Sequence, residues 1–339
     1  MTEASTSGWY RYWAGGSGDP PRPATSRPAD PEVFHVERPD PVQVDPPQRE
    51  PSGPLPPTDA ASPPPPPVRG AQRYAQATVL AVANQKGGVG KTTTAVSLAA
   101  ALAEQGLHVL LVDFDPQGNA SSGLGLRAGP EDTSIYDVIV DDVPITDAVV
   151  QTSQVRLDMV RATIDLAGAE VELVSAFSRE HKLRRALDAV RGEYDAVVID
   201  CPPSLGLLTV NAMTAADGVI VPIQCEYFAL EGLGALRRNA ELIREQLNPH
   251  LEMTGFVLTM MDSRTKLSQQ VVDEVHAHFG ERVFDARIPR TVRLAEAPGF
   301  GQPITQCDPA SRGAMAYRRL AREVIGRLDQ RAARQGAVA

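Results

Sequence analysis

Residues 84 to 94 read Asn84-Gln85-Lys86-Gly87-Gly88-Val89-Gly90-Lys91-Thr92-Thr93-Thr94. The apolar run at residues 79 to 83 suits a buried parallel strand, and residues 94 to 103 suit a helix. Glycines at 87, 88 and 90 let the chain curl with its backbone N–H groups turned inward, where they can cradle phosphate oxygens. The stretch therefore predicts a nucleotide-binding loop between a strand and a helix.

The side chains of this loop add to the prediction. Lys91 is placed to reach the β- and γ-phosphates, and the Thr92 hydroxyl can coordinate Mg²⁺. In the common pattern G-x-x-x-x-G-K-[ST] the first glycine would fall at Gln85, and a second lysine, Lys86, stands five residues before Lys91. The residues expected to contact the nucleotide are Lys86, Gly87, Gly88, Val89, Gly90, Lys91, Thr92 and Thr93.

This loop resembles the deviant Walker A motif of the ParA/MinD family of P-loop ATPases. The resemblance implies ATP and Mg²⁺ as ligands. It also implies that Lys86 reaches across a homodimer to the phosphates bound by the partner subunit, so Lys86 and Lys91 are both candidate catalytic residues.

Further apolar runs at residues 109 to 112, 196 to 199, 218 to 223 and 255 to 258 alternate with helical patterns. This alternation predicts an α/β fold, a doubly wound and mostly parallel sheet covered by helices on both faces. Ligands bind such sheets at the carboxyl ends of the strands. The chemical residues are therefore expected where the runs end.

Acidic residues follow two of these runs. Asp113 and Asp115 come after the second run along the chain, and Asp200 comes after the next. Carboxylates beside phosphates can hold Mg²⁺ or orient an attacking water. By the family resemblance, Asp115 positions the water, Asp113 supports the Mg²⁺ or the phosphate loop, and Asp200 binds Mg²⁺ through a water, as in a Walker B segment.

The C-terminal region is basic although the chain carries a net charge of −9. From Arg282 to Arg334 there are 11 arginines, no lysine and 5 acids, a local balance of +6, and such a region can bind DNA. Residues 261 to 268 and 288 to 298 resemble chromosomal ParA (Soj) proteins. That resemblance implies non-specific DNA contact by Arg264 and Arg293, with Pro289 and Arg290 near the adenine.

The first 72 residues differ in composition from the rest, because they hold 18 of the 29 prolines. We expect residues 1–72 to be a disordered proline-rich extension and residues 73–339 to form one ATPase domain. An aromatic cluster at residues 9 to 13 is a candidate docking peptide for a polar or cytoskeletal partner. A neutral cluster or a misassigned start codon are the alternatives.

Taken together, the resemblance implies a cytoplasmic, nucleoid-associated ATPase that dimerises on ATP, binds double-stranded DNA without sequence preference and segregates a chromosome or plasmid. A ParB-type partner would stimulate hydrolysis. The alternatives are a cargo-positioning ATPase, a nucleotide-switched scaffold and a MinD-like membrane ATPase with an amphipathic C-terminal helix. Against membrane binding, we expect the last helical stretch to pack on the body. Its apolar residues are Met315, Tyr317, Leu320, Val324, Ile325 and Leu328.

The remaining composition adds two expectations. No segment has the length and apolarity of a membrane span, and no secretion signal is recognised at the start of the sequence. Cys201, Cys225 and Cys307 have no metal-binding spacing, so we expect them to be reduced and structural.

Overall fold

The computed structural model describes residues 72–226 and 233–336. The chain divides into two units, Met1–Pro64 and Pro65–Ala339, and every described residue belongs to the second. All of the predicted disordered extension except Gln72 lies outside the described residues, as does the aromatic cluster at residues 9 to 13.

A mostly parallel sheet forms the centre of the second unit. Its eight strands in the described residues have the order β3-β4-β2-β5-β1-β6-β7-β8. They are β1 (Thr78–Val82), β2 (Val109–Asp113), β3 (Val149–Gln151), β4 (Leu157–Val160), β5 (Ala196–Asp200), β6 (Gly218–Gln224), β7 (Glu252–Met261) and β8 (Val283–Pro289). Only β3 runs antiparallel to its neighbour among these strands. The predicted fold class is confirmed, although β3, β4 and β8 were not among the predicted strands.

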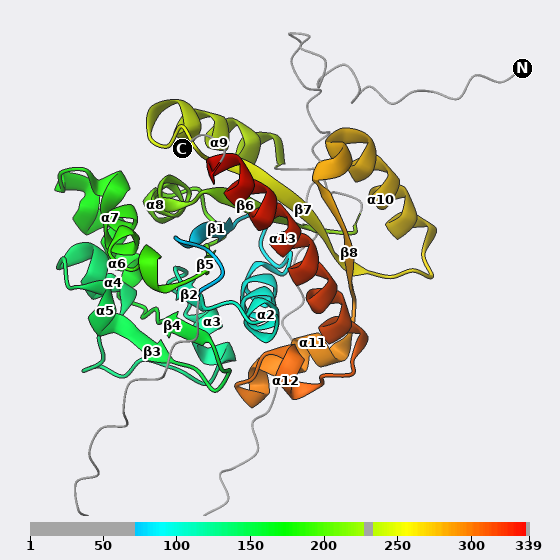
Figure 1. Ribbon diagram of the computed structural model, residues 1–339, viewed down its shortest axis with the longest axis horizontal. Coiled ribbons are helices and arrows are strands. Elements are labelled where there is room, and N and C mark those ends of the chain that lie inside the picture. Colours follow the sequence, from blue (N-terminus) through cyan, green and yellow to red (C-terminus); the bar gives the residue numbers. More distant parts are fainter. Residues whose placement is uncertain (1–71, 227–232, 337–339) are drawn as a thin grey trace, which may run out of the picture. The chain divides into compact units, whose positions relative to one another are not determined.

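Helices connect the strands and cover both faces of the sheet (Figure 1). The α-helices are α2 (Lys91–Glu104), α3 (Asn119–Gly123), α4 (Ile135–Val140), α5 (Ile145–Ala148), α6 (Leu166–Glu172), α7 (Lys182–Asp188), α8 (Leu207–Ala215), α9 (Leu233–Gln246), α10 (Lys266–Phe279), α11 (Val292–Glu296), α12 (Ile304–Cys307) and α13 (Arg312–Gly336). Short 3₁₀ turns are η1 (Leu173–Ser175), η2 (Arg179–His181), η3 (Arg191–Glu193), η4 (Gly280–Arg282) and η5 (Ala297–Phe300).

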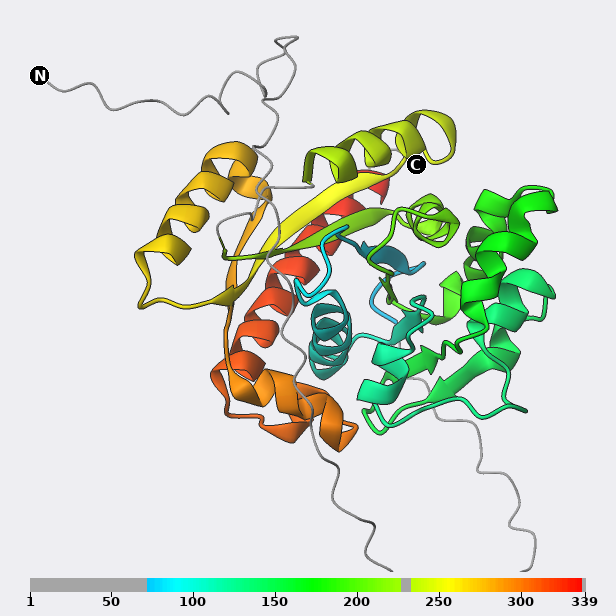
Figure 2. The same ribbon diagram turned by 180° about the vertical axis from the view of Figure 1, so that it is seen from behind.

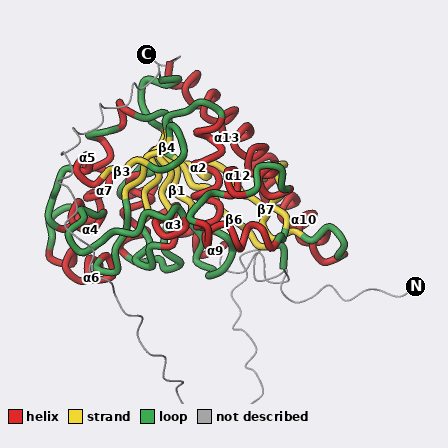
Figure 3. The backbone as a smooth tube through the Cα atoms, turned by 90° about the horizontal axis from the view of Figure 1, so that it is seen from below, coloured by secondary structure: helices red, strands yellow, loops and turns green. Residues whose placement is uncertain are grey.

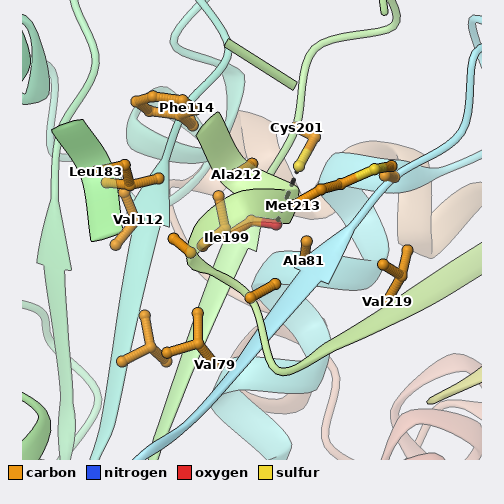
Figure 4. Packing of buried hydrophobic residues seen from close by; sticks show 14 of the residues in the cluster. Val79, Ala81, Val112, Phe114, Leu183, Ile199, Cys201, Ala212, Met213 and Val219 are labelled. Carbon is orange, nitrogen blue, oxygen red and sulfur yellow. Dashed lines mark hydrogen bonds between the residues drawn. The ribbon is translucent and has the colours of Figure 1, made fainter. Parts of the chain in front are cut away.

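The two faces of the sheet have separate cores, because successive strand residues point to opposite sides. Leu80 and Val82 of β1 pack in one core with α2 and α13, whereas Val79 and Ala81 pack in the other. Seen along the sheet, α13 lies on one side of the strands and α9 on the other (Figure 3). Figure 4 shows the second core, in which Ile199 of β5 lies near Met213 of α8.

The C-terminal helix packs on the body as predicted. Helix α13 lies against α2 and β8, and it runs past α2 in both views of the ribbon (Figures 1 and 2). Tyr317, Leu320 and Val324 are fully or almost fully buried, and the Tyr317 hydroxyl lies 3.3 Å from Thr94 Oγ1. Met315 is the exception, since its side chain is 53% exposed. Within the described residues, no helix has the length and apolarity needed to cross a membrane.

Asp195, just before β5, ties the start of the described chain to the sheet. Its carboxylate accepts hydrogen bonds from the backbone N–H groups of Arg73 (2.6 Å), Tyr74 (2.9 Å) and His108 (2.8 Å). The Arg73 guanidinium also pairs with Asp329 of α13 at 2.8 Å. These contacts fasten residues 73 and 74 to the amino end of β5, at the opposite end of that strand from Asp200.

Candidate nucleotide-binding site

Strand register brings the predicted acids together. Parallel pairing sets Asp200 of β5 beside both Val82 of β1 and Asp113 of β2. Residues paired in this way on adjacent strands point to the same face of the sheet. Asp113 and Asp200 are therefore neighbours at the carboxyl edge, next to the loop that follows β1.

The loop itself has the backbone of a phosphate cradle. Gly88 and Gly90 have φ of 76° and 86°, a left-handed conformation that favours glycine, and Gly90 immediately precedes α2. A Cβ added at Gly87 or Gly88 would meet no atom within 4 Å, so the chain leaves open space there. Helix α2 begins at Lys91, three residues earlier than predicted, which puts its first N–H groups at the end of the loop.

Two side chains outside the glycines hold this loop in place. The Asn84 Nδ2 donates to the Pro222 carbonyl of β6 at 2.7 Å, and its Oδ1 accepts from the Lys86 amide at 3.0 Å. From β7, the buried Thr259 hydroxyl donates to the Val89 carbonyl at 2.8 Å. The loop is thus braced by the two strands on one side of β1.

The two lysines occupy different positions. Lys91 is buried, and its Nζ donates to the Lys86 carbonyl at 3.3 Å, which folds the side chain back over the loop. Burial lowers the pKa of Lys91, while the nearby carboxylates of Asp200 and Asp115 oppose that shift. Lys86 is half-buried, and its side chain forms no ion pair within the described residues.

Asp113 is held by hydrogen bonds. Its Oδ2 accepts from both the amide and the hydroxyl of Ser121 at 2.7 Å, and its Oδ1 accepts from the Asp115 amide at 3.3 Å. Burial nevertheless raises the pKa of Asp113 to about 6, with the Ser121 contacts opposing the rise. Asp113 therefore organises the loop from residue 113 to residue 121.

Asp200 is fully buried, and neither carboxylate oxygen has a hydrogen-bond partner within the described residues. Burial, and then the charge of Asp113, raise its pKa well above the ordinary value. The nearby Thr92 side chain and the charge of Lys91 oppose that rise. A buried, unpaired carboxylate beside a helix-start hydroxyl fits a divalent cation.

The chemistry of this donor set agrees with Mg²⁺ in particular. No group of three or more His, Cys, Asp or Glu side chains suited to a metal is found within residues 72–226 and 233–336. Mg²⁺ in phosphoryl-transfer sites is held by one or two protein oxygens together with substrate phosphates and water, so a complete protein cage is not required.

Asp115 lies just past the end of β2, close to Lys91 and Asp200. It is buried, its Oδ1 accepts from the Gln117 amide at 3.0 Å, and its charge acts on both Lys91 and Asp200. The next residue after Asp200, Cys201, is a buried free thiol whose pKa is raised by burial. Asp115 is thus a carboxylate within the electrostatic reach of the lysine and the acid.

The other predicted site residues lie farther along the same carboxyl edge. Pro289 ends β8 in register with Met261 of β7, and the Arg290 amide donates to the Met261 carbonyl at 3.1 Å. Arg264 pairs with Asp262 at 2.7 Å, and Arg293 pairs with Glu296 at 3.2 Å. Both arginines are largely exposed and already carry an intramolecular partner.

Three residues that shape the site were not predicted as site residues. The side chains of Asn84, Ser121 and Thr259 each make a bond that only tertiary contact creates. Asn84 and Thr259 at least carry a signal, because each is a polar residue at the carboxyl end of an apolar run. No local pattern marks Ser121.

Comparison with known proteins defines the class first. A family profile described as an AAA domain matches residues 77–253. The chain is 43% identical to cobyrinic acid a,c-diamide synthase from Mycobacterium smegmatis, whose crystal structure holds ADP and magnesium, with a TM-score of 0.64 over 73% of this chain and 93% of that one. A variant of McdA from Cyanothece in complex with ATP shares the fold at 22% identity, with a TM-score of 0.67 over 74% and 97% of the two chains. The chain is a P-loop ATPase.

Curated relatives give the family. The chromosome partitioning protein ParA of Caulobacter vibrioides is 55% identical over 258 residues, which covers 76% of this chain and 97% of the relative. The sporulation initiation inhibitor protein Soj of Bacillus subtilis is 54% identical over 246 residues, 73% and 97% of the two chains. The chain belongs to the ParA/Soj family of chromosome-partitioning ATPases, as the resemblances at residues 84 to 94, 261 to 268 and 288 to 298 implied.

Proposed function

We propose that this chain is a Mg²⁺-dependent ATPase that dimerises on binding ATP, binds DNA without sequence preference and drives chromosome or plasmid segregation. A ParB-type protein is the proposed activator of hydrolysis, and the cytoplasm at the nucleoid is the proposed location. The observation that carries the proposal is the meeting of Lys91, Asp115 and Asp200 at the edge where the glycine cradle ends.

The roles follow from the contacts of each residue. Lys91, at the first position of α2, binds the phosphates of its own subunit together with the loop amides. Thr92 and Asp200 hold the Mg²⁺, which when bound neutralises charge on the phosphates. Asp115 orients the attacking water. Asp113 is a positioning residue, because its oxygens are engaged by Ser121 and the Asp115 amide.

Lys86 is proposed to act in trans. Its carbonyl accepts from Lys91, while its own side chain has no ionic partner within the described residues. A lysine just outside its own cradle can supply charge to phosphates bound by a second subunit. Face-to-face closure of two subunits follows from that role.

DNA binding is proposed for the exposed arginines of the carboxyl edge. Arg264 and Arg293, which are themselves largely exposed, can exchange their intramolecular carboxylates for DNA phosphates at little cost, because ion pairs at the surface contribute roughly 0 to 1 kcal/mol. Phosphate contacts of this kind carry no sequence information. Pro289 and Arg290 are proposed to lie near the adenine.

Sedimentation of the purified chain with ATP, ADP or no nucleotide, with and without plasmid DNA, tests the proposal. We expect dimers and DNA binding only with ATP. Lys91→Ala should lose nucleotide binding, whereas Lys86→Ala should keep most of it and lose the dimer. A Lys86→Ala chain that dimerises normally with ATP would remove the role in trans.

Charge-reversal variants test the proposed contacts with DNA. Arg264→Glu and Arg293→Glu should abolish DNA binding while the ATP-dependent dimer persists, and Arg237→Glu on α9 is the matched control because it is an exposed arginine paired with Glu241 at 3.3 Å. Unchanged DNA affinity in both test variants would move the DNA surface elsewhere.

A further inference from the structure

Helix α13 lies against α2, and the two helices share one core of the protein (Figure 2). The buried residues that they contribute to this core are mostly apolar. They include Ala95, Leu98, Ala99 and Leu102 of α2 and Ala314, Leu320, Ala321 and Val324 of α13. Apolar packing of about the right volume holds a fold together, but it specifies the exact position of one helix on another only weakly.

One pair of hydroxyl groups interrupts this apolar contact. The Tyr317 hydroxyl lies 3.3 Å from Thr94 Oγ1, and the two residues are 1% and 0% exposed. Exchanging both hydroxyls for apolar groups of the same shape is nearly neutral in general, because the hydrogen bond mainly offsets the cost of taking both groups out of water. A buried polar pair that adds little stability is best attested as a device that fixes the register of one helix on another.

Thr94 belongs to the turn of α2 that carries the phosphate-binding groups. Its amide donates to the Gly90 carbonyl at 2.9 Å, which closes the turn that contains Lys91 and Thr92. Because a hydrogen-bonded helical turn moves as a unit, a shift of Thr94 displaces Lys91, Thr92 and the first N–H groups of the helix. The Tyr317 hydroxyl therefore reaches the groups proposed to bind phosphate and Mg²⁺ through a single intervening residue.

The next residue of α13 holds the other end of α2. Arg318 donates to both carboxylate oxygens of Glu104, the last residue of α2, from Nε at 2.7 Å and from Nη2 at 3.1 Å. The two side chains are 26% and 23% exposed, and a two-point contact of this kind fixes direction as well as distance. Two consecutive residues of α13 thus contact the first and the last turn of α2.

Helix α13 can position α2 because it is itself fixed to the sheet. Toward its C-terminal end, Arg331 pairs at 3.1 Å with Asp217, which immediately precedes β6. The Arg327 guanidinium lies over the Phe284 ring of β8, 3.9 Å from the ring centroid. These contacts hold α13 on the sheet independently of α2.

We propose that α13 positions the phosphate-binding end of α2, with Tyr317 acting through Thr94 and Arg318 acting through Glu104. Both are positioning residues for ATP hydrolysis. A misplacement of about 1 Å in a catalytic site can cost about 100-fold in rate, so a fixed helix register has a direct kinetic consequence. The inference rests on the proposed ATPase function, because it names residues that support that same reaction.

The test removes the hydroxyl pair and keeps its shape. Tyr317→Phe, Thr94→Val and the double variant are made in the full chain, and phosphate release with Mg²⁺ and ATP gives kcat and KM. Titration with a fluorescent ADP analogue counts the sites, so that kcat refers to molecules that bind nucleotide. We expect the double variant to unfold within about 3 °C of the wild type. Its kcat should fall at least about tenfold while KM changes by less than about threefold, because exact positioning matters most in the transition state.

Two matched controls separate this effect from a general loss of the fold. Tyr194→Phe removes the hydroxyl of another buried tyrosine, which packs in the other core and donates to Asp158 at 3.0 Å. This variant should keep the wild-type kcat. Arg318→Met should lower kcat several-fold, whereas Arg319→Met, which removes an arginine paired with Glu323 at 3.3 Å on the same helix, should not.

A double variant with the wild-type kcat per nucleotide-binding site would overturn the proposal. If the double variant does not fold, the arginine variants decide, and equal kcat for Arg318→Met and Arg319→Met would overturn it. A wild-type chain that hydrolyses no ATP would instead refute the proposed function, which keeps the two failures distinct.

Discussion

Two aspartates at opposite ends of β5 are both fully buried, yet their surroundings differ completely. Asp195, just before the strand, accepts three backbone N–H groups, from Arg73, Tyr74 and His108. Asp200, the last residue of the strand, accepts none from the part of the chain that the structure describes. Five residues of sequence separate a buried carboxylate with three hydrogen-bond donors from one that has none among the described residues.

The difference separates stability from function. A buried carboxylate that accepts several hydrogen bonds stabilises the fold, because each hydrogen bond to a charged group contributes roughly 1.5 to 3 kcal/mol. One with none destabilises the protein, and such groups cluster at functional sites. We therefore expect Asp195 to stabilise the fold and Asp200 to act in the candidate nucleotide site.

The largest expected effect is on catalysis at Asp200. Asp200→Asn keeps the shape of the side chain but removes the charge proposed to hold Mg²⁺, so ATP hydrolysis should fall by at least about 100-fold. Phosphate release at saturating ATP measures it. Hydrolysis within a few-fold of the wild-type rate would contradict the catalytic role proposed for Asp200.

The next effect is on stability at Asp195. Asp195→Ala leaves the amides of residues 73, 74 and 108 without their acceptor, and the free energy of unfolding should fall by about 3 kcal/mol. Urea unfolding followed by circular dichroism measures the loss. Hydrolysis by the folded fraction at low temperature should stay within a few-fold of wild type, and a loss as deep as that of Asp200→Asn would contradict the structural role.

A smaller and opposite effect is expected for the stability of Asp200→Asn. Without nucleotide, this variant should be more stable than wild type at neutral pH by about 1 kcal/mol or more, because it relieves a buried unpaired charge. The raised pKa of Asp200 favours its protonated form in the folded state. Its contribution is therefore fully present below the unfolded pKa and is lost as the pH rises.

The stability difference between Asp200→Asn and wild type should consequently be small near pH 4 and grow as the pH rises. The pKa of Asp113 is also raised on folding, to about 6, so its contribution to stability depends on pH in the same direction; Asp113 is present in both proteins. Thermal unfolding of the two proteins in matched buffers from pH 4 to pH 8 follows the difference. A difference that shrinks with rising pH would show that Asp200 is compensated in solution.

The smallest effect is expected at the start of the domain. Deleting residues 2–72 keeps every contact of Asp195 and should change the unfolding free energy by less than about 0.5 kcal/mol, with hydrolysis near wild type. Deleting residues 2–76 removes two of the three donors to Asp195 and the pairing of Arg73 with Asp329, and should cost about 2 kcal/mol. Equal stability of the two truncated chains would show that the folded domain does not begin at residue 73.

The predictable part of the molecule is the part with short-range signals. Eleven consecutive residues, 84 to 94, are enough to predict the glycine loop, and five strands are predicted from continuous apolar runs. Strands β3 and β4 were missed because they have three and four residues, too few for a pattern. Strand β8 was missed because only continuous apolar runs were assigned as strands, whereas β8 alternates buried and exposed residues, which is the pattern of a half-buried edge strand.

For the candidate site, the sequence predicted which residues take part but not how they are arranged. Asp113 and Asp200 were both predicted beside the nucleotide, whereas the hydrogen bonds that distinguish them come from Ser121, a residue with no local signal. Likewise, Arg264 and Arg293 were predicted as exposed cations, and their partners Asp262 and Glu296 were not considered.

The sequence by itself determined the glycine loop between a strand and a helix, the positions of five strands along the chain and the class of fold, because glycine conformation, apolar runs and helix starts act over a few residues. Only the tertiary structure decided which buried acid is satisfied. Residues 73 and 74 reach Asp195 across more than 120 residues of chain, and register alone sets Asp113 beside Asp200. Hydrogen-bond donors at that separation are brought together by packing, which no local pattern encodes.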